Sequence, residues 1–180
     1  MKIKYIEGDL FSPLLNDKEP GAIVIPHVCN NQGAWGAGFV VPLGRNFPIE
    51  KQKYLQWADI DEINLSDPIF GLGSTQFVNV NDKIFVANMV AQTLGGNRPL
   101  YYNYLSKCMD EVACFTLKRT ESRENEARII CPAFGAGLAG GNWPFIEQLI
   151  QDCWIKRNIQ VTVYYLENTK PEGLINECSI

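Results

Sequence analysis

The sequence contains a single histidine, and no two of its six cysteines form a Cys-x-x-Cys pair. This scarcity argues against a zinc site, and no metal or cofactor is expected. Free thiols in a reducing cytosol explain the cysteines more simply than a disulfide framework does. No apolar run is long enough to span a bilayer, and the chain opens directly on a strand pattern, so we expect a soluble, cytoplasmic protein with no membrane partner.

The sequence also lacks a run of basic residues and a linker. Its 16 basic residues are scattered among 20 acidic ones, for a net charge of −4. Because nucleic-acid binding draws its affinity from clustered Lys and Arg, we expect no direct nucleic-acid binding. No Pro- or Ser-rich stretch divides the 180 residues, of which 46% are hydrophobic, so the chain is predicted to form one domain over 1–180.

Two glycine-rich segments are the most informative part of the sequence. The first, 27–39, follows the β-branched run 21–25, which is typical of a central strand covered on both faces. The second, 131–143, follows a short apolar run and precedes a helix for which Asn142 is the predicted N-cap. Neither fits the P-loop or the dinucleotide fingerprint. Together they predict a ligand cleft at the carboxyl edge of a sheet, where backbone N–H groups can approach an anion.

Hydrophobic periodicity predicts alternating strands and helices. The pattern predicts helices over 49–58, from Pro99 onward, and over the segment that contains 146–153. Turn residues within 78–84 indicate a hairpin, which makes the sheet mixed. We therefore predict a three-layer α/β/α domain. Its strands are expected at 2–7, 22–26, 75–79, 83–90, 128–131 and 160–166.

These motifs resemble the macro domain family, whose members bind ADP-ribose in a cleft formed by two such loops. The resemblance spans most of the chain, from Gly8-Asp9-Leu10 to the closing strand at 161–164. The first loop reads Cys-Asn-x-x-Gly-x-Trp-Gly-x-Gly, which is similar to the branch that contains ADP-ribose 1″-phosphate phosphatases and the terminal ADP-ribose protein glycohydrolase. The resemblance implies ADP-ribose or its 1″-phosphate as the small-molecule ligand, with an ADP-ribosylated macromolecule as a further partner.

The resemblance also implies roles for individual residues. Asp9 would accept a hydrogen bond from the adenine amino group, although it could equally serve as a turn or N-cap acceptor. Leu10 would shape the adenine pocket, and Asn30 would hold the distal ribose. The phosphates would meet the backbone of the two loops, at Gly36, Ala37, Gly38 and Phe39 on one side and at Gly135, Ala136, Gly137 and Leu138 on the other.

Aromatic and amide side chains provide further candidates. Trp35 could cover the terminal phosphate or the protein-facing side of the pocket, and Phe134 could pack on the ribose. Either ring could instead belong to the core, which is the safer interpretation for Phe134. Gln92 could direct its amide at the distal ribose or its phosphate, and so could Asn88 unless it is a paired core residue.

Catalysis is where the sequence departs from part of this branch. The glycohydrolase uses a lysine and an aspartate at positions that are Gln92 and Ala139 here, so that mechanism lacks both of its groups. A phosphatase needs mainly positioning and one proton-transfer group. His27, which the phosphatases also carry, is our candidate, with Asn30 beside it. The alternative for His27 is a buried histidine bonded to backbone.

Three functions follow from the same cleft. The chain could bind ADP-ribose and hydrolyse ADP-ribose 1″-phosphate to ADP-ribose and phosphate, which is our main prediction. It could instead be a reader that binds ADP-ribose without turnover. It could also hydrolyse another ADP-ribose derivative, as a mono-ADP-ribosyl hydrolase does.

Overall fold

The central sheet has six strands, of which five run parallel. The computed structural model describes residues 1–59, 68–97, 99–121, 126–167 and 170. The strands lie in the order β1-β6-β5-β2-β4-β3, and β3 is antiparallel to β4, so the predicted mixed sheet and hairpin are confirmed. The strand bounds are Lys4–Glu7 (β1), Ile23–Asn30 (β2), Thr75–Asn79 (β3), Ile84–Gln92 (β4), Arg128–Pro132 (β5) and Val161–Tyr165 (β6).

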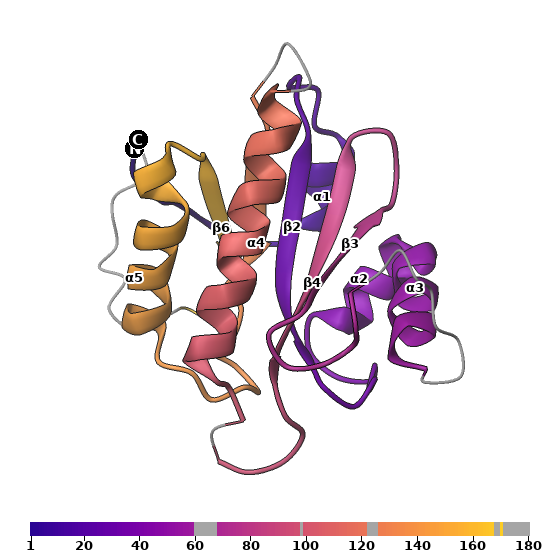
Figure 1. The fold of residues 1–180 in the computed structure, drawn as a ribbon. Coiled ribbons are helices and arrows are strands. Elements are labelled where there is room, and N and C mark those ends of the chain that lie inside the picture. The colour runs from indigo at the N-terminus through magenta and orange to yellow at the C-terminus, as the bar shows by residue number, and fades with distance from the viewer. Residues whose placement is uncertain (60–67, 98, 122–125, 168–169, 171–180) are drawn as a thin grey trace.

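Helices cover both faces of the sheet, which confirms the three-layer α/β/α prediction (Figure 1). One layer contains α1 (Phe11–Leu15), α2 (Val40–Asn46) and α3 (Pro48–Ala58). The other contains α4 (Tyr102–Glu121) and α5 (Trp143–Cys153), which is followed by the 3-10 turn η1 (Ile155–Arg157). Asn142 accepts a hydrogen bond from the Phe145 N–H and so caps α5, as predicted.

Strand β2 is buried on both faces, as its β-branched composition predicts. Ile23 and Ile25 pack with the cluster that includes α1 and α2, while Val24 packs with the larger cluster that includes α4 and α5. All three are fully buried. The two hydrophobic clusters therefore lie on opposite sides of this strand, and β2 is the framework on which the sheet edge is positioned.

Two element boundaries and one short helix differ from the predictions in ways that affect the site. Strand β2 ends at Asn30 rather than at Pro26, because its pairing with β4 continues through His27 and Asn88, so His27 lies inside the strand. Helix α4 begins at Tyr102 rather than near Pro99, because Leu100 forms a β-bridge with Gln92. The short helix α1 was not predicted, because its five residues are too few to show a period.

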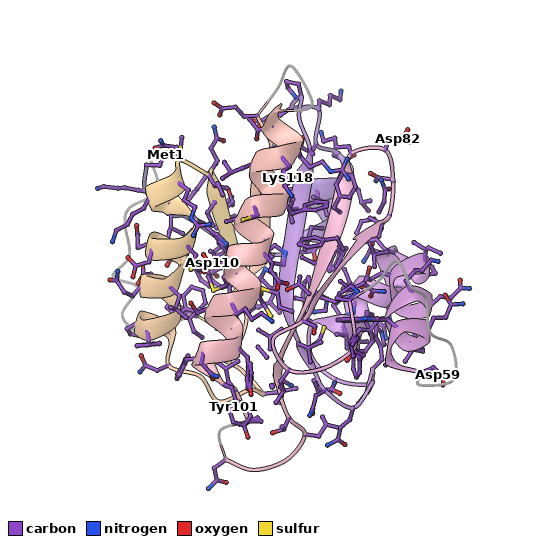
Figure 2. All side chains as sticks on the ribbon, in the orientation of Figure 1. Met1, Asp59, Asp82, Tyr101, Asp110 and Lys118 are labelled. Atoms are coloured by element: carbon purple, nitrogen blue, oxygen red, sulfur yellow. The ribbon has the colours of Figure 1, made fainter. Side chains whose placement is uncertain are left out.

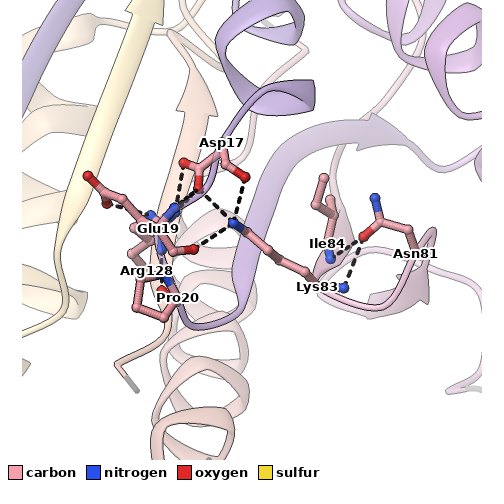
Figure 3. A network of polar contacts seen from close by, with 7 residues as sticks. All are labelled: Asp17, Glu19, Pro20, Asn81, Lys83, Ile84 and Arg128. Carbon is pink, nitrogen blue, oxygen red and sulfur yellow. Dashed lines mark hydrogen bonds and ion pairs between the residues drawn. The ribbon is translucent and has the colours of Figure 1, made fainter. Parts of the chain in front are cut away.

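The amino edge of the sheet is held together by ion pairs. Both oxygens of Asp17 accept from Arg128 Nη2 at 2.7 Å, and Lys83 Nζ lies 2.6 Å from Asp17 Oδ1 (Figure 3). Lys83 also donates to the Glu19 carbonyl, and Arg128 to the Pro20 carbonyl. This cluster, which we call the Asp17 network, ties the segment before β2 to the starts of β4 and β5.

Side chains fill the layers on either side of the sheet (Figure 2). In that view Asp82 marks the amino edge, beside the start of β4, and Tyr101 marks the carboxyl edge, beside the start of α4. The five cysteines within the described residues are all free, and Cys178 lies outside them. No helix in the described ranges is both long and apolar enough to cross a bilayer.

Candidate functional site

A cavity of about 980 Å³ opens at the carboxyl edge of the sheet. Its lining comes from the ends of five parallel strands or from the segments that follow them. Strands β2 and β5 are neighbours whose chains continue to opposite sides of the sheet, and ligands of open α/β proteins bind at such a switch point. The predicted site residues on its wall are Asp9, Leu10, His27, Ala37, Gly38, Phe39, Gln92, Phe134, Gly135, Ala136, Gly137 and Leu138.

The side chain of Asn30 organises the first loop. Its Oδ1 accepts from the backbone N–H groups of Gln32 and Ala34, each at 3.0 Å, and its Nδ2 donates to the Ala34 carbonyl at 2.8 Å. The Tyr54 hydroxyl donates to the Asn30 carbonyl at 2.8 Å. Asn30 is 7% exposed and is not among the described residues on the cavity wall. These bonds give it a structural role, and its predicted ribose contact and catalytic role stay predictions.

Both glycine loops offer unused backbone donors. Within the described residues, no hydrogen bond to protein engages the N–H groups of 36–39 or of 135–138. Neighbouring N–H groups are bonded, for example that of Gly140 to the Gly137 carbonyl and that of Gly141 to the Gly135 carbonyl. Two runs of N–H groups without a described protein acceptor therefore lie at one sheet edge, and backbone donors of this kind can bind an anion.

The two loops meet across the cavity. A Cβ atom added at Gly38 would lie 3.4 Å from Leu138 Cδ1, and Gly38 has a φ of +72°, which favours glycine. In the second loop, a Cβ at Gly141 would lie 2.6 Å from the Gly135 carbonyl oxygen. Leu138 itself is 75% exposed, so its side chain is available to cover a ligand held between the loops.

The end of the cavity near β1 contains Asp9 and Leu10. Asp9 is exposed, and its Oδ2 accepts from the Ser12 N–H at 2.8 Å, which is the turn role considered above. The bond uses one carboxylate oxygen, so adenine recognition by the other stays a prediction. Leu10 is 4% exposed and belongs to the core cluster beneath α1. It presents an apolar wall to the cavity.

The aromatic candidates separate into two groups. The Phe39 ring lies on the cavity wall, 5.6 Å between centroids from both Phe11 and His27. Phe134 is 4% exposed and packs on Trp154 and Trp143, which confirms its place in the core, although it also borders the cavity. Trp35 is half-buried against Tyr54 at 5.2 Å. Neither Trp35 nor Gly36 is among the described wall residues, so ligand contact by these two stays a prediction.

His27 lies on the cavity wall but is only 1% exposed. Its Nε2 lies 2.6 Å from Asn88 Oδ1, so Asn88 is the paired core residue that the sequence left open, and the Cys29 Sγ lies 3.6 Å from His27 Nδ1. Burial lowers the pKa of His27 to about 4, against the opposing effects of its hydrogen bonds with Asn88 and with the Val28 backbone. The ring is therefore neutral at pH 7. It can act as a base, but it is not a protonated imidazolium that could act as an acid.

Glu50 is the polar residue that the sequence analysis missed. It is fully buried, its Oε1 accepts from Asn88 Nδ2 at 2.5 Å, and burial raises its pKa to about 8, although the Asn88 hydrogen bond lowers it. A signal was present in the sequence. Glu50, Tyr54 and Trp57 are spaced i, i+4 and i+7, which places the carboxyl group on the buried face of α3.

Comparison with known proteins places the chain in a family. No family model matches it. A protein of Meyerozyma guilliermondii named "ADP-ribose 1''-phosphate phosphatase" is 34% identical, over 92% of this chain and 99% of its own. A solved macrodomain protein from Streptomyces coelicolor is 36% identical, covers 91% of this chain and 98% of its own, and superposes with a TM-score of 0.73. This chain belongs to the macro domain family.

A second solved structure is also similar to this macro domain. A protein of unknown function from Bacteroides thetaiotaomicron is 38% identical, covers 92% of this chain and 99% of its own, and has a TM-score of 0.77. In this macro domain, Gln92 and Ala139 both lie on the cavity wall. Neither an amide nor a methyl group can supply the amine or the carboxylate of the glycohydrolase mechanism.

Proposed function

We propose that this macro domain binds ADP-ribose in its cleft and hydrolyses ADP-ribose 1″-phosphate to ADP-ribose and phosphate. The observation that carries the proposal is the pair of facing loops, whose backbone N–H groups at 37–39 and 135–138 lie on the cavity wall and have no hydrogen bond to protein within the described residues. Such donors can hold a diphosphate without basic side chains, which suits a chain of net charge −4. The similarity to a protein named as a phosphatase of this ester supports the choice of substrate.

The cavity suggests how the ligand would lie. Adenine would rest against Leu10, with its amino group donating to Asp9, and the diphosphate would bind between Gly38 and Leu138. The distal ribose would then reach towards Gln92 at the end of β4. This path runs along the carboxyl edge from β1 to β4, which is the extent of the cavity wall.

Hydrolysis requires a water molecule to attack the terminal phosphorus. A phosphorus–oxygen bond forms with water, the bond to the anomeric oxygen breaks, and that oxygen takes a proton to leave ADP-ribose. Neutral His27 would accept a hydrogen bond, and then a proton, from the attacking water. A base with a pKa of about 4 is weak, so we expect its contribution to lie near the lower end of the roughly 10²- to 10⁴-fold range of general-base catalysis.

A reader without turnover is the second candidate. Asp9 is the only carboxylate among the described wall residues, and it lies at the adenine end of the proposed path. His27 is then the only imidazole on the described wall, whose remaining titratable side chains are those of Tyr102, Tyr164, Tyr165 and Lys170. A cleft with strong anion donors and one weak base is compatible with binding alone.

Phosphate release separates these functions. The purified protein is incubated with ADP-ribose 1″-phosphate while inorganic phosphate is measured, and ADP-ribose is titrated by calorimetry. We expect both release and binding, and His27→Gln should lower release about 100-fold while ADP-ribose affinity stays within about twofold. Binding without release would establish the reader. Absence of both would refute the proposed cleft function.

A glycine variant tests the anion nest itself. Gly38→Ala places a side chain at positive φ, and relief of that strain moves the loop away from its donor geometry. We expect ADP-ribose affinity to fall about fivefold by calorimetry. Gly71→Ala is the matched control, because a Cβ there meets nothing within 4 Å and Gly71 is away from the cavity wall. Equal affinities for the two variants would count against the nest.

A further inference from the structure

Four buried polar side chains form a chain of hydrogen bonds behind the cleft. They are His27 on β2, Asn88 on β4, Gln76 on β3 and Glu50 on α3, and none is more than 2% exposed. Asn88 is the centre. Its Oδ1 lies 2.6 Å from His27 Nε2, and its Nδ2 donates to Glu50 Oε1 at 2.5 Å and to Gln76 Oε1 at 3.1 Å. We call these four residues the Glu50 network.

The direction of each hydrogen bond follows from the amide groups. Gln76 Nε2 donates to the Lys53 carbonyl at 3.2 Å, so Gln76 presents its oxygen to Asn88. Asn88 therefore presents its NH₂ group to two oxygen acceptors, because the reverse orientation would face oxygen with oxygen. Its own oxygen then faces His27, and Nε2 of the ring must carry a proton in order to donate to it at 2.6 Å. Nδ1 is left as the acceptor of the neutral ring, and the Cys29 Sγ lies 3.6 Å from both this nitrogen and Asn88 Oδ1.

Glu50 has no balancing cation in the described part of the chain. No described lysine or arginine forms an ion pair with it, and its second oxygen, Oε2, is buried without a hydrogen-bond partner. The Cys29 thiol of β2 interacts electrostatically with Glu50, and Tyr54 of α3 interacts with Cys29. Burial raises the pKa values of both groups, so both are neutral at pH 7. A carboxylate here would be a buried charge with one donor, which strongly favours the protonated acid.

We propose that Glu50, uncharged, is a positioning residue that acts through Asn88 to fix His27 as the Nε2–H tautomer and leave Nδ1 as the acceptor of the ring. This inference rests on the proposed function, since His27 is the base proposed there. Ionised Glu50 would polarise the Asn88 amide and make its oxygen a stronger acceptor. The basicity of His27 would then rise, so the charge of Glu50 controls the proton affinity of a ring that it does not touch.

The single histidine makes the tautomer directly measurable. Protein labelled with ¹⁵N-histidine gives ring signals from His27 alone in long-range ¹H–¹⁵N spectra. Near pH 6.5 we expect a protonated Nε2 and an unprotonated Nδ1. A ring with the proton on Nδ1, or on both nitrogens, would overturn the proposal. This readout needs no turnover, so it distinguishes a failure of this inference from a failure of the phosphatase function.

Glu50→Gln tests the link to Glu50. The glutamine retains an oxygen for Asn88 Nδ2 but does not titrate, so we expect the Nε2–H tautomer to persist near pH 6.5. In the wild type the His27 ring signals should shift in a step near pH 8, and this step should vanish in Glu50→Gln. Glu111→Gln, on α4 beside Lys107, should retain the step. A step that persists in Glu50→Gln, or is absent from the wild type, would overturn the proposal.

The turnover rate gives a second readout that mere structural support would not change. If phosphate is released, the kcat of the wild type should change as pH rises through about 8 while that of Glu50→Gln stays level across the same range. KM should remain within about twofold for both, because Glu50 does not reach the cavity wall. Parallel pH profiles for the two proteins would refute the coupling.

Discussion

The Asp17 network and the Glu50 network connect the same two strands in opposite ways. Asp17 bonds to Arg128 and Lys83 before the starts of β2 and β4, whereas Glu50 bonds through Asn88 to His27 farther along these strands. The pairing of Ile23 with Ile84 and of His27 with Asn88 separates the two levels by four residues, or about 13 Å. The first network is held by full charges, and the second carries none near neutral pH.

Solvent access explains the difference. The side chains of Asp17 and Lys83 are 15% and 27% exposed, so water and two cations stabilise the carboxylate. Burial alone would raise the pKa of Asp17, but the hydrogen bonds from Arg128 and Lys83 hold it below its ordinary value. Glu50 is fully buried and has no ion pair among the described residues, and burial raises its pKa. A side-chain carboxyl group thus stabilises the amino edge of the sheet as an anion at Asp17, whereas at Glu50 it is a neutral acid that acts on the His27 ring.

Removal of Asp17 should have the largest effect on stability. Asp17→Ala removes the bidentate carboxylate of Arg128, whose side chain is only 9% exposed, and leaves it with the exposed carboxylate of Glu19 at 3.7 Å. We expect the free energy of unfolding to fall by about 3 kcal/mol, measured by urea denaturation near pH 7. Asp152→Ala is the matched control, because its carboxylate also lies 2.6 Å from a lysine, Lys156, but at the exposed surface. A similar loss in both variants would show that burial does not distinguish the pairs.

Glu50→Gln should change the pH dependence of stability. The pKa of Glu50 is higher in the folded than in the unfolded chain, so its stabilising effect is full below about pH 4.5 and is lost as pH rises towards about 8. Glutamine does not titrate. Relative to the wild type, the variant should therefore gain about 3 kcal/mol between about pH 5 and pH 8, measured by urea denaturation across that range. A constant difference would mean that Glu50 is ionised throughout.

The titration of His27 should change the free energy of unfolding with pH in the opposite direction to that of Glu50. Its pKa is lower in the folded than in the unfolded chain, so stability is lost as pH falls from about 6.5 to about 4. Over much of that interval Glu50 stabilises the folded state increasingly as pH falls, so the two effects should nearly cancel in the wild type. The slope should appear in Glu50→Gln, where we expect a loss of about 2 kcal/mol on acidification. A flat profile in that variant would place the His27 ring in contact with water.

The sequence predicted the cleft better than it predicted the groups behind it. The β-branched run of β2 and the two glycine loops have local signatures, and the structure places both loops at one edge. The partnership of His27 with Asn88 and Glu50 depends on strand register and on how α3 packs, which no local pattern encodes. The sequence predicts that Asn30 contacts the ligand, whereas in the structure its side-chain amide forms hydrogen bonds with the backbone of its own loop.

The smallest expected effect is that of ionic strength, which should change the stability contribution of the Asp17 network but not that of the Glu50 network. Salt screens charges near the surface and has little influence on neutral groups. As sodium chloride rises from about 0.05 M to about 1 M, the stability lost in Asp17→Ala should shrink by about 0.5 kcal/mol, while the difference between Glu50→Gln and the wild type near pH 6 should stay constant. Urea denaturation at the two salt concentrations measures both. A salt-sensitive Glu50→Gln difference at that pH would reveal a charge on Glu50, and the contrast between a charged edge and a neutral interior would then be wrong.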